Sequence, residues 1–260
     1  MRDICDDLTA EHEALDAIVA PLAEEAWRTA TPADGWTVAD SVSHLWFFDG
    51  TAALAASDPA AFDESKRALL ALTGAGDDPS IEPGRAIPGA ELLQRWRHDR
   101  LHLVDVLRGL DPSERLPWYG PAMGARSFAT ARLMETWAHG QDIVDALGAT
   151  RPATARLKHI AHIGVRARPF SYVINGRTMP ETDVRVELRG PDGDLWTWGG
   201  AASTDRIEGD ALEFCLLVTQ RRHRDDTALR VTGAGAHEWA GFAQAFAGGP
   251  GAGREPGRFR

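Results

Sequence analysis

Apolar residues recur at three- and four-residue steps along the first 150 positions of the chain, which is the spacing of amphipathic helices. This periodicity predicts helices over residues 2–25, 38–56, 59–73, 90–110 and 128–147. Thr37 is predicted as the N-cap of the second helix, with Asp40 in the capping-box position, and Ser127 as the cap of the last. Residues 74–88 are rich in Gly, Pro and Asp, which predicts a loop. Four long helices joined by loops favour an antiparallel bundle.

Beyond residue 150 the pattern changes to that of a smaller α+β unit. Residues 184–188 alternate with period two, which predicts a strand that forms a hairpin with residues 195–198 across a Pro-Asp-Gly-Asp turn. Further elements are expected as a helix over 152–167, a helix over 210–222, a strand over 228–232 and a short helix over 237–247. The predicted fold class is α+β and mainly α, with a bundle over 1–150, a small α+β domain over 151–248 and a disordered tail over 249–260.

Charge and composition narrow the class of protein. The chain has 38 acidic and 28 basic residues, with 25 acids and 12 bases up to residue 150 and 13 acids and 16 bases after it. Binding to nucleic acid needs a basic face, so no nucleic-acid partner is expected. No signal segment or run of about 18 apolar residues is present, so no membrane partner is expected either. Cys5 and Cys215 lie far apart, and a reducing, cytoplasmic location is the simplest expectation.

Three pairs of titratable residues at helical spacing are candidates for chemistry. Glu135 and His139 stand four residues apart on one predicted helical face, and His44 on the second helix completes a metal-binding set if the helices face each other. Zinc suits these donors, although iron and nickel also accept them. A solvated ion pair is the alternative, but the apolar neighbours favour a metal because buried polar groups need partners. The other pairs are His98 with His102, for which a solvated surface is expected, and His159 with His162, for which surface or interface positions are expected.

Two segments resemble the DinB-like metalloprotein superfamily. Residues 35–45, Gly-Trp-Thr-Val-Ala-Asp-Ser-Val-Ser-His-Leu, resemble its G-W-[ST]-V-x-D-x-x-x-H-L signature. Residues 132–142, Arg-Leu-Met-Glu-Thr-Trp-Ala-His-Gly-Gln-Asp, resemble the R-x-x-E-x-x-x-H-x-x-D helix of its mycothiol-dependent maleylpyruvate isomerase branch. The resemblance covers the first 150 residues well and the remainder more loosely.

The resemblance implies a DinB-like four-helix bundle with a zinc ion held by His44, Glu135 and His139. It also implies that the low-molecular-weight thiol mycothiol is a co-substrate and that the chain is an isomerase or an S-transferase. Arg132 and Asp142 match family positions near the ligands, and Asp142 is a candidate for orienting an imidazole, with a surface ion pair as the alternative. The candidates for binding a substrate carboxylate are Arg126 and Arg177.

The expected partners are therefore a thiol and a small electrophilic molecule. Two other functions remain open on the sequence alone. One is a hydrolase or lyase in which the metal activates water, and the other is a non-catalytic metal- or ligand-binding protein. A homodimer is also left open.

Overall fold

The computed structural model of the chain describes residues 1–72 and 78–259. The chain forms two compact units, Met1–Arg151 and Pro152–Arg260. Residues 73–77 lie outside the described residues. They comprise the last residue of the helix predicted over 59–73 and the first four residues of the loop predicted over 74–88.

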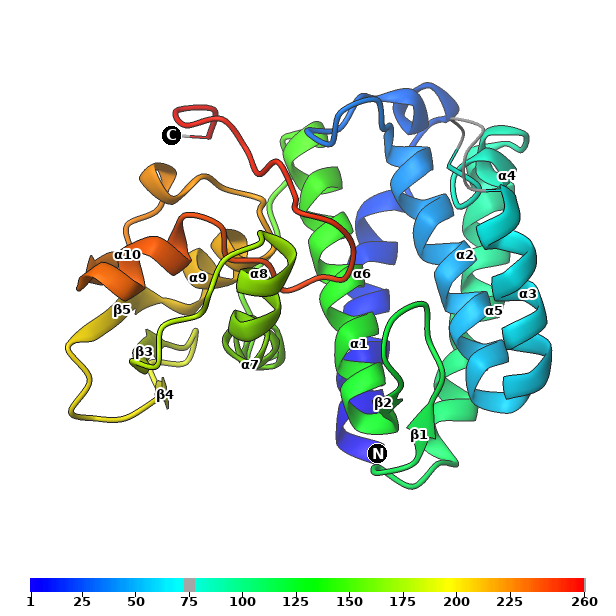
Figure 1. The fold of residues 1–260 in the computed structure, drawn as a ribbon. Coiled ribbons are helices and arrows are strands. Elements are labelled where there is room, and N and C mark those ends of the chain that lie inside the picture. Colours follow the sequence, from blue (N-terminus) through cyan, green and yellow to red (C-terminus); the bar gives the residue numbers. More distant parts are fainter. Residues whose placement is uncertain (73–77, 260) are drawn as a thin grey trace. The chain divides into compact units, whose positions relative to one another are not determined.

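The first unit is built from long helices. Their bounds are α1 (Arg2–Val19), α2 (Val38–Ser57), α3 (Pro59–Leu72), α5 (Gly89–Arg108) and α6 (Ala125–Leu147). Shorter elements join them, namely the 3₁₀ helix η1 (Glu24–Arg28), α4 (Glu82–Arg85) and a hairpin of β1 (Arg115–Leu116) and β2 (Met123–Gly124). Helices α1, α2, α5 and α6 pack on one another as a four-helix bundle, and α3 packs on α2 (Figure 1). No helix in the described part of the chain is long and apolar enough to cross a membrane.

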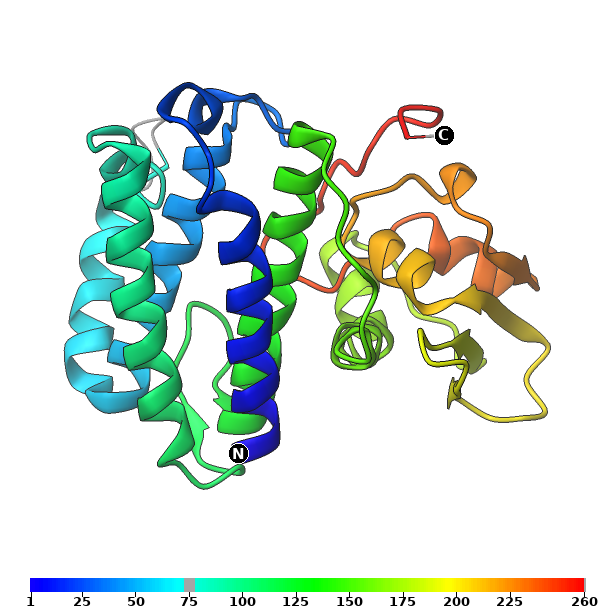
Figure 2. The same ribbon diagram turned by 180° about the vertical axis from the view of Figure 1, so that it is seen from behind.

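The bundle helices do not simply alternate in direction, because α3 lies between α2 and α5 in the chain. Helix α3 runs back along α2, so α5 begins at the same end of the bundle as α2 and runs parallel to it (Figures 1 and 2). Helix α1 is antiparallel to α5, since Asp16 pairs with Arg97 whereas Asp6 pairs with Arg108. Helix α6 is in turn antiparallel to α2. The predicted four-helix bundle is confirmed, with its helices running up, down, down and up rather than in simple alternation.

The bundle core lies between these helices. It contains Leu15, Val19, Trp27, Val38, Val42, Leu45, Leu92, Leu93, Trp96 and Ile143. Gly89, the first residue of α5, lies against the ring of Trp27, and a Cβ there would come within 2.3 Å of that ring. Only glycine therefore allows η1 to close over the start of α5.

The second unit combines a four-stranded sheet with short helices. The strand order is β4 (Leu195–Trp198), β3 (Val184–Arg189), β5 (Asp205–Asp210) and β6 (Arg230–Thr232). Strands β3 and β4 form the predicted antiparallel hairpin, while β3 and β5 are parallel. The helices are α7 (Leu157–Arg166), α8 (Arg168–Ile174), α9 (Ala211–Val218) and α10 (Ala234–Ala240). A 3₁₀ turn, η2 (Arg224–Asp226), lies between α9 and β6. The apolar residues of β3 are buried and the alternating polar ones are not, as its period-two pattern predicts.

Several local predictions were wrong, each for a physical reason. Ser127 does not cap α6, whose N-cap is Gly124. The first amide groups of α6 donate instead to the carbonyl oxygens of Glu114 and Pro112, so the preceding turn satisfies them. Strand β5 was missed because its pattern is mostly polar, and helix α8 because it follows α7 with only one intervening residue. Helix α10 begins at Ala234, three residues before the predicted start.

The glycine-rich C-terminal segment makes defined contacts within the second unit. The amide of Gly251 donates to Oε1 of Gln244 at 2.8 Å. The amide of Gly257 donates to both carboxylate oxygens of Asp226, at 2.7 and 2.9 Å. Residues 249–259 thus follow turns and irregular chain against this unit.

Candidate metal centre

His44, Glu135 and His139 meet between α2 and α6. His44 lies in the second turn of α2, and the other two lie one turn apart in the middle of α6, which runs in the opposite direction. One ligand atom from each residue lies within 4.8 Å of the other two, and the two imidazole centroids are 4.5 Å apart. Within residues 1–72 and 78–259, this is the one group of three His, Cys, Asp or Glu side chains so arranged.

The geometry of these three side chains suits a divalent cation. Nε2 of His139 lies 3.5 Å from Oε2 of Glu135, which is too far for a strong hydrogen bond. Two ligands around a tetrahedral zinc ion stand about 3.4 Å apart when each bond is about 2.0–2.2 Å. Nδ1 of His139 is also buried without a hydrogen-bond partner among the described residues. Two imidazoles and one carboxylate are donors that zinc accepts while keeping a position for a further ligand.

Aromatic rings pack against both imidazoles. Trp36 stacks on His139 with a centroid distance of 5.5 Å and an interplanar angle of 13°, and its ring lies 5.1 Å from that of His44. Phe48, one turn after His44, lies 4.6 Å from the same imidazole and contacts Trp118 in turn. Trp36 therefore packs on both candidate histidine ligands. Trp36 and Phe48 are half-buried, so they shield one side of the imidazoles from water, which strengthens electrostatic interactions there.

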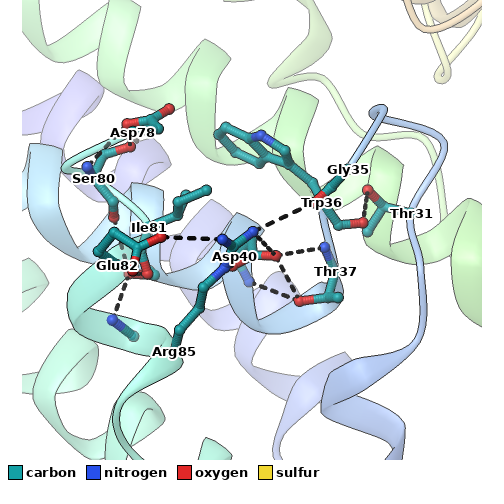
Figure 3. A network of polar contacts seen from close by, with 12 residues as sticks. Thr31, Gly35, Trp36, Thr37, Asp40, Asp78, Ser80, Ile81, Glu82 and Arg85 are labelled. Atoms are coloured by element: carbon teal, nitrogen blue, oxygen red, sulfur yellow. Dashed lines mark hydrogen bonds and ion pairs between the residues drawn. The ribbon is translucent and has the colours of Figure 1, made fainter. Parts of the chain in front are cut away.

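The start of α2 is fixed by polar contacts (Figure 3). The Thr37 hydroxyl accepts from the amide of Asp40, and the Asp40 carboxylate accepts from the amide of Thr37, which confirms the predicted capping box. Arg85 of α4 donates to both oxygens of the same carboxylate. Burial raises the pKa of Asp40, but hydrogen bonds from Arg85 and Thr37 outweigh burial and hold that pKa below its usual value. These bonds fix the segment just before His44.

The segment before α4 packs on α2 beside His44. The Ser43 hydroxyl donates to the carbonyl oxygen of Ser80 at 2.9 Å and accepts from the amide of Gly84 at 3.1 Å. Nδ1 of His44 lies 2.9 Å from Oγ of Ser80. Sequence reasoning missed Ser80 because its position relative to His44 depends on the path of the intervening chain, and no local spacing indicates that path.

The remaining predicted site residues lie elsewhere. Arg132 is buried and pairs with Asp49, its Nη2 lying 2.9 Å from Oδ1. Asp142 is buried on α6, three residues after His139, but does not hydrogen-bond Nδ1 of that imidazole. Its surface ion-pair alternative is excluded by this burial.

The two arginines considered for a substrate carboxylate both pair with acidic residues of their own unit. Arg126 binds both oxygens of Asp3 at 2.8 and 2.6 Å. It lies nine residues before Glu135 on α6, a distance of about 13 Å along the helix. Arg177 in the second unit donates to Glu238 at 3.2 Å. The structure therefore does not place Arg126 beside the candidate ligands, and a carboxylate-binding role for either residue stays a prediction.

The other histidine pairs lie outside this cluster. His98 and His102 are exposed on α5, as expected. In the second unit His162 is exposed on α7, and its Nδ1 accepts from the indole of Trp198 at 3.2 Å. These positions leave His44, Glu135 and His139 as the candidate metal ligands.

Comparison with known families bears on this site. The family described as mycothiol maleylpyruvate isomerase N-terminal domain matches residues 8–144, which is more than half of the chain and includes all three candidate ligands. The chain belongs to this family. A second family, described as wyosine base formation, matches residues 180–232 within the second unit. The resemblance noted in the sequence and the expected class of thiol-dependent enzyme are thereby confirmed at the level of the family.

Individual relatives and solved structures are also similar to this chain. Uncharacterized proteins from two strains of Mycobacterium tuberculosis are 46% identical over 248 residues, covering 95% of this chain and 96% of each relative. Among solved structures, the mycothiol-dependent maleylpyruvate isomerase superposes with a TM-score of 0.56 at 13% identity, covering 85% of this chain and 89% of that one. A histidine-to-alanine mutant of that enzyme gives 0.54 at 14%, over 88% and 92%. These similarities confirm the mainly α, α+β fold.

Proposed function

We propose that this chain is a zinc-dependent enzyme that uses a low-molecular-weight thiol, mycothiol, to attack a small electrophilic molecule, as an isomerase or an S-transferase. The observation that carries the proposal is the convergence of His44, Glu135 and His139 between antiparallel helices. Family membership supports the thiol, since the matching family is described by mycothiol.

The residues of the site have distinct roles in this proposal. His44, Glu135 and His139 would hold a zinc ion, whose charge keeps a nearby thiol deprotonated near neutral pH. Trp36 and Phe48 shield one side of the imidazoles from water. The thiolate sulfur adds to one carbon of a double bond conjugated to a carbonyl group, and the π electrons move to the carbonyl oxygen as an enolate. The resulting carbon–carbon single bond rotates, and the returning electron pair expels the thiolate and restores the double bond in the other geometry. In a transferase the enolate carbon takes up a proton from solvent instead, and the new carbon–sulfur bond stays in the product.

Metal content measured by elemental analysis tests the site. We expect about one zinc per chain in the wild type and a loss of zinc in His139→Ala, because two ligands are too few for a stable site. His102→Ala is the matched control, since it removes an exposed imidazole from α5, and it should keep its zinc. Absence of metal from the wild type after zinc addition, or full zinc in His139→Ala, would contradict the proposal.

Thiol use is tested separately with the zinc-loaded protein. A thiol that binds the folded state raises its stability by mass action, by about 2.7 kcal/mol at a hundredfold excess over the dissociation constant. We expect mycothiol to raise the thermal midpoint and to be required for isomerisation of an electrophilic acid. Turnover that is independent of thiol would indicate a metal-hydroxide hydrolase or lyase instead. Bound zinc without any turnover would indicate a binding protein.

A further inference from the structure

A chain of hydrogen bonds runs from Asp78 through Ser80 to His44. Oγ of Ser80 donates to Oδ1 of Asp78 at 2.7 Å and lies 2.9 Å from Nδ1 of His44. The amide of Ser80 donates to the same oxygen of Asp78 at 2.9 Å, so the turn that presents the hydroxyl is held by the carboxylate it contacts. Ser80 is only 2% exposed, so water has little access to its hydroxyl, whereas Asp78 is exposed at the end of the chain of bonds. Figure 3 shows Asp78 and Ser80 beside the start of α2.

The direction of these bonds follows from the number of protons. A serine hydroxyl carries one proton, and a carboxylate only accepts hydrogen bonds. The proton of Ser80 is therefore directed to Asp78, and the oxygen of Ser80 is left to accept from His44. Nδ1 of His44 must then carry a hydrogen, which leaves the lone pair of the neutral imidazole on Nε2.

We infer that Asp78 and Ser80 act as positioning residues, which select the Nδ1–H tautomer of His44 and direct its Nε2 lone pair toward Glu135 and His139. The metal-binding part of this inference rests on the proposed zinc site, whereas the tautomer does not. An imidazole whose other ring nitrogen donates a hydrogen bond in this way is a more basic and better oriented metal ligand. Neutral free histidine favours the opposite tautomer, so the two residues change which nitrogen is available.

The segment that carries Asp78 and Ser80 is held against α2 by contacts that do not involve the Ser80 hydroxyl. The Ser43 hydroxyl donates to the backbone carbonyl of Ser80, and the amide of Gly84 donates to the Ser43 hydroxyl. Arg85 ties α4 to Asp40 at the start of α2. Loss of the Ser80 hydroxyl therefore leaves these anchors in place, which makes Ser80→Ala a clean substitution. Ser41→Ala is the matched control, because it removes from α2 a buried hydroxyl that has no hydrogen-bond partner among the described residues, and it leaves the Ser80 segment anchored.

The tautomer is read directly from the metal-free protein. In ¹⁵N-histidine-labelled protein at about pH 8, well above the usual histidine pKa of about 6.5, we expect His44 to show a protonated Nδ1 and an unprotonated Nε2. The signals are assigned by their loss in His44→Gln. Ser80→Ala should shift His44 toward the Nε2–H form, and Ser41→Ala should not. A wild-type His44 in the Nε2–H form, or a Ser80→Ala protein with unchanged ring signals, would refute the proposed tautomer selection, whether or not the protein binds metal.

Zinc affinity, measured by competition with a chelator, tests the consequence. Loss of a group that orients a metal-binding histidine lowers metal affinity about 10–100-fold. We expect that loss in Ser80→Ala, with the affinity of Ser41→Ala close to that of the wild type even if its thermal midpoint changes. Equal losses in both variants would overturn the positioning role and indicate a packing effect. If the wild type shows the Nδ1–H tautomer but binds no zinc, the proposed function is contradicted and the tautomer selection is supported.

Discussion

Carboxylates bound by arginines occur in both units, but the two environments differ. In the bundle, Asp49 of α2 is completely buried and accepts from the indole of Trp96 at 2.9 Å and from Nε of Arg132 at 3.0 Å. Nε2 of His12 on α1 lies 3.6 Å from the same carboxylate. This buried network joins α1, α2, α5 and α6.

On the sheet of the second unit, the corresponding contacts are made by partly exposed side chains. Glu187 of β3 is 2.9 Å from Nε of Arg185 and 2.9 Å from Nη2 of Arg206 on β5. On β5, Oε2 of Glu208 lies 2.8 Å from Nη2 of Arg230 on β6. We call this row of ion pairs across β3, β5 and β6 the sheet ladder. The side chain of Glu187 is 23% exposed, so water already solvates part of each charge.

The comparison of the two environments shows that a buried charge constrains the structure more than an exposed one does. An exposed ion pair contributes little because water competes for both partners. A buried charge has lost its water, so removal of its partner is costly even where the intact pair adds little net stability. Only one register of α2 against α6 brings Asp49 to Arg132, and the same register places His44 opposite His139. The buried network therefore sets the geometry of the candidate metal centre from one turn away.

The largest effect is expected for Asp49→Ala. It leaves the Arg132 guanidinium buried without its carboxylate, which typically costs about 3–5 kcal/mol. The free energy of unfolding, followed by denaturant titration and tryptophan fluorescence, should fall by that amount. Asp49→Asn keeps an acceptor for Trp96 and removes the charge, so its loss should be smaller than that of Asp49→Ala but still large. An Asp49→Ala protein as stable as the wild type would remove the contrast between the two regions.

Sequence reasoning succeeded where local rules decide the structure. Helix α2 spans Val38–Ser57, against a prediction of 38–56, because Thr37 and Asp40 fix its start by contacts three residues apart. The bundle followed from helical periodicity. The three candidate ligands were found because two of them share one helical face and the third stands in a matching motif. In each case the signal lies within a few residues of the feature.

The rest depends on contacts between distant segments. Ser80 reaches His44 only because α3 and the following turn bring the chain back to α2. His12 meets Asp49 only after the bundle has assembled, and no spacing relates them. Strand β5 has few apolar residues and is a strand because β3 and β6 flank it. Such features need the tertiary structure, since the sequence near each of them favours no particular partner.

A second effect, of intermediate size, is a pH dependence caused by His12. Burial, with Arg100 and Arg132 nearby, outweighs the attraction of Asp49 and lowers the pKa of His12 to about 4. The unfolded chain binds a proton at this residue below about pH 6.5, whereas the folded chain does not until about pH 4. Stability should therefore fall as the pH drops through this window, by about 3 kcal/mol in total. The measurement is the free energy of unfolding of the first unit between these pH values.

A substitution separates this dependence from that of other groups. His12→Asn removes the titrating ring, so the fall in stability should become shallower across the same window. His162→Asn is the control, because partial desolvation and the nearby Arg166 also lower the pKa of His162, but that residue lies in the second unit. The stability of the first unit in His162→Asn should keep the slope of the wild type. An unchanged slope in His12→Asn would show that other groups carry the pH dependence.

The smallest effect is expected from the sheet ladder. Hydrogen bonds from Arg185 and Arg206 lower the pKa of Glu187, yet its charge remains in contact with water. Glu187→Gln keeps the size and an acceptor oxygen while it removes the charge, so the unfolding midpoint of the second unit should move far less than that of the first unit in Asp49→Asn. Added salt should shrink the difference from the wild type further, because it screens exposed charges. A salt-insensitive loss as large as that of Asp49→Asn would show that the ladder is as structural as the buried network, and the contrast between the two units would then lie in their folds rather than in their solvation.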